Sequence, residues 1–207
     1  MIDGIILAAG ESKRFGRPKQ LISWRGKPLI RHIVEVALGS QLRTLVVVIG
    51  YAARDVRQAL HPLDEHPRLR IVLNPEYEEG QASSIRWGVR ALEPGAEAVM
   101  FLTCDQPLLT SSLLDALLES FARHRPLICY PVHARQRGSP TIFSAVLLPE
   151  LLQLTGDVGG RVLIEKYRAR VHEHRVNSPR PLRDIDTPDD LADLEKDLAS
   201  SGNREGD

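Results

Sequence analysis

Short apolar segments alternate with segments of helical periodicity along the first two thirds of the chain. The apolar segments are rich in β-branched residues and predict buried strands at 4–8, 44–50, 70–74, 98–104 and 127–132. Apolar residues spaced three or four apart predict helices between them, at 28–40, 53–60, 82–92 and 111–124. This alternation predicts an α/β fold with a doubly wound, mostly parallel sheet.

The pattern changes after residue 132. It then predicts an extended segment or hairpin, two short helices, an exposed strand and a final helix, at 133–143, 144–154, 159–167, 170–176 and 187–199 in that order. The hairpin would turn around Gly138. The final helix has Thr187 as its N-cap and Pro188 as its first residue, which are typical of a helix start.

The chain of 207 residues is long enough for one domain with a sizeable core. Because no repeat, low-complexity tract or linker interrupts it, we predict a single domain at 1–199 and a polar, disordered tail at 200–207. Lys and Arg together number 27, as do Asp and Glu, so the net charge is zero. The chain-wide basic face of a nucleic-acid-binding protein is therefore not expected.

The two cysteines, Cys104 and Cys129, form neither a CxxC pair nor a disulfide framework, which is typical of a cytoplasmic protein with reduced thiols. The N-terminus has no basic region followed by a long apolar run, so we expect no signal peptide. No apolar stretch approaches the ~20 residues that span a bilayer, so a membrane is not expected as a partner.

A loop rich in basic residues, "LAAGESKRFGRPKQL" at 7–21, follows the first predicted strand. Ligands of parallel sheets bind at the carboxyl ends of the strands. The small residues at 8–10 allow close approach to backbone N–H groups that can bind an anion, and Arg14 and Lys19 add positive charge. Phosphate is therefore the expected ligand. Neither GxGxxG nor GxxxxGK[ST] is present, and a solvated surface loop is the alternative.

Acidic residues follow two later segments. Asp105 comes at the end of the fourth predicted strand in "CDQP", and Asp184 and Asp186 precede the final helix in "DIDTPDDL". Acids from two separate loops suit Mg²⁺, which prefers oxygen ligands in an octahedron. The alternative is that each acid only stabilises a helix start. His172 and His174 share a face of a predicted strand, but no His/Cys set has zinc spacing.

The segment "NPEYEEGQASSIRWGV" at 74–89 leads from a strand through a polar loop into a helix that begins near Gln81. Its free N–H groups, with Gly80 and Ser84, can meet a ligand edge or a phosphate, although an ordinary helix cap is the alternative. The segments "GSPTIF" and "GDVGGR" follow the fifth predicted strand and would line a second half of the site. Candidate residues there are Arg137, Gly138, Ser139, Asp157 and Arg161. For the two arginines, a solvated surface charge is the alternative.

These motifs follow one another along the chain in the same order as in a known family. Together they resemble the nucleotidyltransferases that activate sugars, lipids and molybdopterin. Within them, the chain is most similar to the molybdenum cofactor cytidylyltransferases, over about residues 2–194. The resemblance implies a Rossmann-like sheet of the nucleotidyltransferase, glycosyltransferase-A-like type. It also implies a nucleotide-binding half at about 1–107 and an acceptor-side half at about 108–199.

The activity implied by the resemblance is Mg²⁺-dependent transfer of CMP from CTP to the terminal phosphate of Mo-molybdopterin, with release of pyrophosphate. Arg14, Lys19 and Asp105 would be the catalytic residues, and Asp105 and Asp186 would hold the metal, with Asp184 as the substitute for Asp186. Expected nucleotide contacts are Leu7, Ala8, Ala9, Gly10, Ser12, Arg14, Lys19, Gly80, Ser84 and Asp105. The product would serve a molybdenum hydroxylase, so the apo-hydroxylase or its chaperone is the expected protein partner.

Two details of the motifs bear on which base and which acceptor the enzyme would use. "AAG" at 8–10 resembles the cytidylyl group, whereas the guanylyl group more often has "AGG", and the Ala9 methyl would narrow the space beside the base. Ser139 stands where the family more often has His, and Gly159 or Gly160 where it has Ala. A guanylyltransferase, a cytidylyltransferase of a sugar or polyol phosphate, and a non-catalytic cofactor chaperone remain alternatives. The basic and acidic candidates together favour an enzyme over the chaperone.

Overall fold

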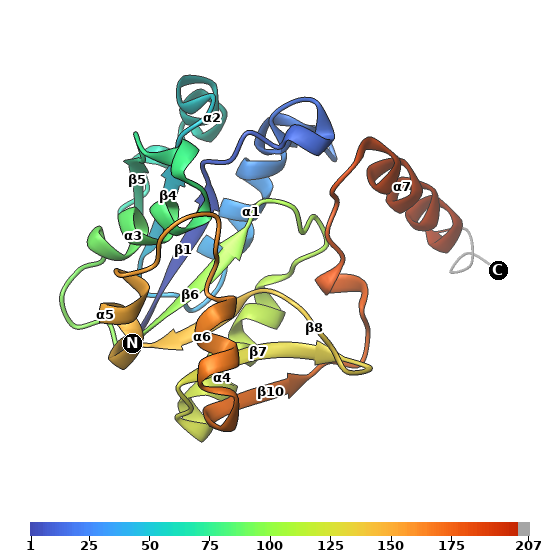
Figure 1. Cartoon of the computed structure of the whole chain (residues 1–207). Coiled ribbons are helices and arrows are strands. Elements are labelled where there is room, and N and C mark those ends of the chain that lie inside the picture. The colour runs from blue at the N-terminus through green and yellow to red at the C-terminus, as the bar shows by residue number, and fades with distance from the viewer. Residues whose placement is uncertain (203–207) are drawn as a thin grey trace.

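An eight-stranded sheet forms the centre of the computed structural model, which describes residues 1–202 (Figure 1). The strand order is β10-β7-β9-β6-β1-β4-β5, and β8 pairs with β7. These strands are β1 (Ile2–Ala8), β4 (Leu45–Ile49), β5 (Leu69–Leu73), β6 (Ala98–Thr103), β7 (Ile128–His133), β8 (Gln136–Arg137), β9 (Thr141–Ser144) and β10 (Val171–Arg175). The helices are α1 (Leu29–Leu38), α2 (Ala53–Leu60), α3 (Gln81–Arg90), α4 (Ser111–His124), α5 (Leu148–Leu151), α6 (Arg161–Lys166) and α7 (Pro188–Gly202).

The sheet is mostly parallel, as predicted. β1 pairs in parallel with both β4 and β6, and β10 pairs in parallel with β7. The five predicted apolar strands are all present, but β5 lies at the sheet edge, where Leu73 is 53% exposed. The prediction that β5 is buried was therefore wrong. A two-stranded ladder, β2 (Ser23–Trp24) with β3 (Lys27–Pro28), was not predicted.

The predicted extended segment at 133–143 contains two antiparallel strands. β8 forms a short hairpin with β7, and β9 then inserts between β6 and β7, antiparallel to both. Phe143 on β9 is 2% exposed, so this strand belongs to the centre of the fold. β9 thereby joins the earlier and later halves of the chain in one sheet.

Two apolar layers cover the sheet, one on each face (Figure 1). One contains side chains of α1, α2 and α4, such as Ile33 and Leu117. The other contains side chains of α3, α5 and α6, such as Ile85 and Leu163. Burial on both faces explains why the central strands are apolar throughout and not alternating.

The sequence correctly located the starts of two helices. Thr110 Oγ1 accepts from Leu113 N (3.2 Å) at the start of α4. Thr187 Oγ1 accepts from Asp190 N (3.2 Å), while Asp190 Oδ2 accepts from Thr187 N (2.8 Å), a reciprocal cap before α7. α7 continues to Gly202, so residues 200–202 are helical and were wrongly assigned to a disordered tail. The rest of the predicted tail, 203–207, lies outside the described residues.

Within residues 1–202, no helix is both long and apolar enough to cross a bilayer.

A buried ion pair holds the start of β1. Asp3 is fully buried, and its carboxylate accepts two hydrogen bonds from the Arg43 guanidinium, at 2.7 and 2.6 Å. We expect Asp3→Ala to lower the free energy of unfolding by about 2 kcal/mol, because it removes charge-assisted hydrogen bonds from a buried site. Arg43 keeps part of its solvent contact and bonds to the Glu93 and Pro94 carbonyls, which limits the loss.

Urea denaturation of Asp3→Ala, Arg43→Ala and the double variant would measure this coupling. The double variant should lose less stability than the sum of the single variants, because the pair is removed only once. Additive losses, or an Asp3→Ala variant as stable as the wild type, would contradict the assignment.

Candidate active site

The basic loop folds back on the end of β1. Its backbone makes two short 3-10 turns, Lys13–Phe15 and Lys19–Leu21. Ser12 Oγ accepts from Lys19 N (3.2 Å), so this hydroxyl ties the two turns together. The Gln20 side chain also reaches back and donates to the Ala8 and Gly10 carbonyls. Ser12 therefore stabilises the fold of the loop. It also lies beside the phosphate site that the sequence predicted.

The loop forms one wall of a cleft of about 540 Å³, hereafter the basic-loop cleft. The opposite wall is the turn that leads into α3. Predicted residues that line this cleft are Leu7, Ala9, Gly10, Ser12, Arg14, Lys19, Gly80, Ser84 and Asp105. Ala8 does not line it: the residue is 1% exposed in the core, and its carbonyl accepts from Gln20. The prediction of a direct contact from Ala8 is therefore not supported by its position.

A charged cluster stands beside the basic-loop cleft. The Lys19 ammonium lies 2.6 Å from Asp186 Oδ1 and 3.6 Å from Asp105 Oδ2, and only 12% of its side chain is exposed. Arg14 Nη1 lies 2.9 Å from Asp186 Oδ2. The structure therefore brings the two predicted cations and the two predicted carboxylates into one cluster.

The two acidic motifs are joined by their backbones. Ile185 N donates to the Asp105 carbonyl (2.8 Å), which holds the segment before α7 against the end of β6. The Asp105 carboxylate also accepts from Thr103 Oγ1 (2.6 Å). These contacts fix Asp105 from both sides, so its orientation does not depend on a ligand.

The two carboxylates of "DID" lie in different surroundings. The hydrogen bond from Lys19, helped by the charges of Lys19 and Arg14, lowers the pKa of Asp186 against the effect of burial. Reduced solvation within the cleft, together with nearby Asp105, raises the pKa of Asp184 to about 6, although its side chain is solvent-accessible. Near neutral pH Asp186 is therefore the more fully ionised of the two, which suits a metal ligand.

A divalent ion fits this pair of carboxylates only with further oxygen ligands. Among the described residues, no group of three or more His, Cys, Asp or Glu side chains is arranged to hold a metal. Asp105 and Asp186 would supply one or two carboxylate oxygens, and phosphate oxygens and water would supply the others. This is the usual donor set of Mg²⁺ in phosphate-transferring sites.

The start of α3 is occupied by an internal carboxylate. Asp157 Oδ1 accepts from Gln81 N (3.2 Å), the first N–H of the helix. Gly80 has φ 98°, and a Cβ added there would lie 2.6 Å from Asp157 Cα, so this close approach requires glycine. Asp157, predicted on the acceptor side, instead lines the basic-loop cleft. Its role towards an acceptor stays a prediction.

A second cleft of about 760 Å³, hereafter the arginine cleft, adjoins the first. Its predicted lining residues are Arg137, Gly138, Ser139 and Arg161, and Arg180 and Arg183 were not foreseen. Aromatic residues contribute apolar surface: Phe101 and Phe143 are in edge-to-face contact with ring centroids 5.8 Å apart. Asp184 is the only acidic residue among those that line this cleft in residues 1–202.

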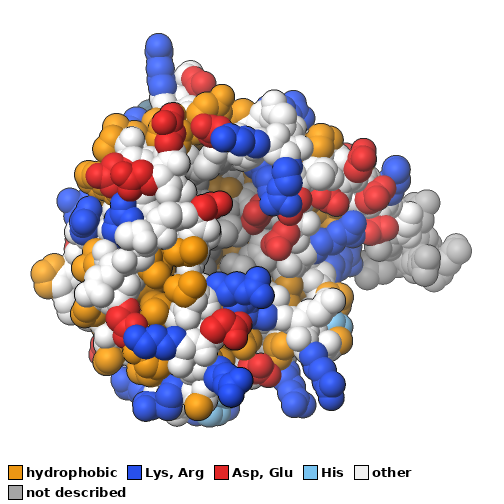
Figure 2. Space-filling model, viewed as in Figure 1, with side chains coloured by type: hydrophobic (Ala, Val, Ile, Leu, Met, Phe, Trp, Pro, Cys, Tyr) orange, Lys and Arg blue, Asp and Glu red, His pale blue; other side chains and the backbone are white. Residues whose placement is uncertain are grey.

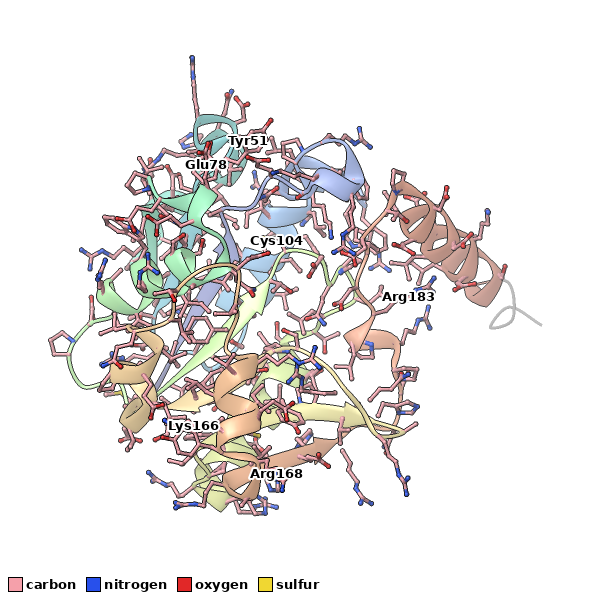
Figure 3. All side chains as sticks on the ribbon, viewed as in Figure 1. Tyr51, Glu78, Cys104, Lys166, Arg168 and Arg183 are labelled. Atoms are coloured by element: carbon pink, nitrogen blue, oxygen red, sulfur yellow. The ribbon has the colours of Figure 1, made fainter. Side chains whose placement is uncertain are left out.

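The two clefts share Leu7, Gln81 and Thr103, so they are continuous at the carboxyl ends of β1 and β6. Figure 2 shows this hollowed face, with acidic and basic side chains gathered around its rim. In Figure 3, Cys104 lies near the middle of the face, Tyr51 and Glu78 at one rim, and Arg183 beside the segment before α7. A ligand in one cleft can therefore reach a ligand in the other.

The Ala9 methyl was expected to narrow the space beside the base, but in the structure it packs inwards. The residue is 2% exposed, and a Cβ added at Gly50 would lie 2.9 Å from the Ala9 Cβ, so the methyl packs against the end of β4.

Tyr77, which the sequence did not reveal, also lines the basic-loop cleft and contacts Tyr51 edge to face. Its place within the "NPEYEEGQ" motif was the only available signal.

Comparison with known proteins gives the family. The model of the MobA-like NTP transferase domain matches residues 4–172. The nicotine blue oxidoreductase of Paenarthrobacter nicotinovorans is 32% identical over 177 residues, which are 80% of this chain and 82% of that protein. The purine catabolism protein PucB of Bacillus subtilis is 30% identical over 198 residues, 90% of this chain and 92% of that protein. A probable molybdenum cofactor guanylyltransferase of Bacillus cereus is 30% identical over 135 residues, 65% of this chain and 64% of that protein.

Among solved structures, Rv0371c of Mycobacterium tuberculosis is similar over 94% of this chain and 97% of its own, with TM-score 0.81 and 30% identity. A manganese complex of Rv0371c has TM-score 0.78 and 28% identity over 94% of this chain and 98% of its own. The family match covers most of the chain, including the basic loop and "CDQP". The chain belongs to the MobA-like NTP transferase family.

Proposed function

We propose that this nucleotidyltransferase moves CMP from CTP to the terminal phosphate of Mo-molybdopterin and releases pyrophosphate. The observation that carries the proposal is the continuity of two clefts of different character beside the Lys19–Asp105–Asp186 cluster. The basic-loop cleft suits a nucleoside triphosphate. The larger arginine cleft suits a large, anionic acceptor with an apolar part.

In this reaction an oxygen of the acceptor phosphate attacks the α-phosphorus of CTP, and the bond to the β-phosphate oxygen breaks. Because the acceptor is already an anion, no side chain has to remove a proton. Lys19 and Arg14 would turn from Asp186 towards the triphosphate and stabilise its developing charge. Mg²⁺ held by Asp105 and Asp186 would neutralise phosphate oxygens. The manganese complex of Rv0371c supports a divalent ion in this fold.

The choice of cytosine rests on the "AAG" form of the loop. Because the Ala9 methyl packs inwards, it would act by fixing the backbone that faces the base. The choice of molybdopterin rests on the sequence resemblance and on the Bacillus cereus relative named as a probable molybdenum cofactor guanylyltransferase. The proposed destination of the product is a molybdenum hydroxylase, reached directly or through its chaperone.

A pyrophosphate-release screen of four NTPs against several acceptors tests the proposal. We expect turnover with CTP and Mo-molybdopterin, dependent on Mg²⁺ or Mn²⁺ and absent in EDTA. Sugar and polyol phosphates should give no turnover with CTP. Equal rates with GTP would contradict the cytosine assignment, and turnover of a sugar phosphate would contradict the acceptor. No turnover with any NTP would favour a non-catalytic carrier of the cofactor.

A further inference from the structure

Gln20 is a buried polar residue that connects the basic loop to the end of β1. The residue is 3% exposed and is among those that line the basic-loop cleft. Nε2 donates two hydrogen bonds, to the Ala8 carbonyl (2.9 Å) and to the Gly10 carbonyl (2.8 Å). One amide group therefore holds two peptide planes of the backbone that forms the wall of the cleft.

These contacts fix the directions of nearby N–H groups. In a trans peptide plane the N–H points opposite to the carbonyl, so holding the Ala8 and Gly10 carbonyls also orients the N–H groups of Ala9 and Glu11. The Ala9 carbonyl is held separately by Tyr51 N (3.0 Å). The three carbonyls at 8–10 are thus occupied by protein donors. The conformation of this turn is therefore set before any ligand arrives.

Gln20 also follows Lys19 directly in one 3-10 turn. Lys19 N donates to Ser12 Oγ, and the Lys19 ammonium contacts both carboxylates of the cluster. A movement of Gln20 would therefore displace the backbone at 8–10 and the Lys19 side chain together. The amide couples the two parts of the loop that face the cleft.

Stability does not account for a glutamine at this position. Gln20 Oε1 is buried and has no hydrogen-bond partner in the described part of the chain. An unsatisfied buried acceptor destabilises the folded state, because it has lost its hydrogen bonds to water. An aliphatic side chain of similar length would avoid that cost but would leave the Ala8 and Gly10 carbonyls without this donor, so the two effects on stability oppose each other. An unsatisfied polar group in the wall of a cleft therefore calls for an explanation other than stability, and function is one.

We propose that Gln20 is a positioning residue for the nucleotide, which holds the turn at 8–10 and Lys19 in the arrangement that binds a nucleoside triphosphate. The inference rests on the proposed nucleotidyltransferase function. A supporting residue of this kind acts by keeping contact groups within a fraction of an ångström of their productive positions. Its loss should weaken nucleotide binding and leave acceptor binding unchanged.

The test compares Gln20→Met with wild type, and uses Gln58→Met, an exposed position on α2, as the matched control. Dissociation constants for Mg·CTP are measured by calorimetry, KM values for CTP and the acceptor by pyrophosphate release, and melting temperatures by circular dichroism. For Gln20→Met we expect nucleotide Kd and KM to rise about 10- to 100-fold. The acceptor KM should stay within twofold of wild type, and the melting temperature within a few degrees. Gln58→Met should match wild type throughout.

An unchanged Kd for Mg·CTP in Gln20→Met would overturn the inference. A lower melting temperature with unchanged Kd and KM would also overturn it, because that pattern indicates a purely structural role. Wild-type protein that binds Mg·CTP but releases no pyrophosphate would overturn the proposed function alone. In that case the ratio of the two Kd values still decides the role of Gln20.

Discussion

Asp105→Asn is expected to lower turnover about 10³-fold while the fold remains intact. The substitution keeps the size of the side chain and an acceptor for Thr103 Oγ1, but it removes the negative charge beside Lys19. Without that charge the site loses one of the two carboxylates proposed to hold the metal. Pyrophosphate release at saturating CTP and acceptor measures the effect, and the melting temperature should stay within a few degrees.

Asp55→Asn is the matched control for this variant, because Asp55 is exposed in the first turn of α2, away from both clefts. It should turn over at the wild-type rate. If Asp105→Asn retained activity within tenfold of wild type at all Mg²⁺ concentrations, Asp105 could not be a metal ligand. A large loss of activity together with a large loss of stability would instead assign Asp105 to the fold.

The meeting of the basic loop and Asp105 could be predicted because it follows from sheet topology. β1 and β6 are parallel neighbours, so the residues after each strand must lie at the same edge of the sheet. An apolar strand followed by a basic loop, and another followed by an acid, therefore predicted adjacent charges. The charge of Asp184 and Asp186 suggested that one of them joins Asp105, but only the resemblance selected Asp186, since its position depends on the backbone hydrogen bond from Ile185 to Asp105.

The strand arrangement that forms the arginine cleft could not be predicted, although four of its lining residues were. It depends on β9, a four-residue strand. β9 lies between β6 and β7 in the sheet although it follows both of them in the sequence. Local periodicity carries no information on such pairings, so 133–143 was predicted only as an extended segment. The place of Asp157 in the wall of the basic-loop cleft could not be predicted either. Its position follows from a close backbone approach to Gly80, far away in the sequence.

Gln20 was missed because nothing in its local sequence distinguishes it. Between Lys19 and Leu21 it is an ordinary polar residue of a surface loop, and its burial becomes visible only when the loop folds back on β1. Patterns of charge and glycine reveal residues that contact a ligand. They do not reveal the residues that hold those contacts in position.

Lys19→Met is expected to lower kcat/KM about 10²- to 10³-fold, with part of the loss in the KM for the nucleotide. The ammonium is the most buried cation of the cluster and contacts both carboxylates. Methionine fills a similar volume but leaves Asp105 and Asp186 without a cation between them. The substitution also removes a hydrogen-bond donor that would bind the triphosphate. Lys19→Arg should recover little of the kcat/KM that Lys19→Met loses, because a planar guanidinium cannot occupy the position of a compact ammonium.

Steady-state rates over a range of CTP concentrations distinguish this variant from Asp105→Asn. Lys19→Met should need more CTP to reach its lower maximum, whereas Asp105→Asn should lose its rate even at saturating nucleotide. Lys196→Met on α7, where the lysine is 75% exposed and pairs only with Asp193 among the described residues, controls for loss of a positive charge. If Lys19→Met and wild type gave the same kcat and KM, Lys19 would serve only to neutralise Asp105 and Asp186. Any positive charge acting on the triphosphate would then come from the other cations of the loop, such as Arg14 and Lys13.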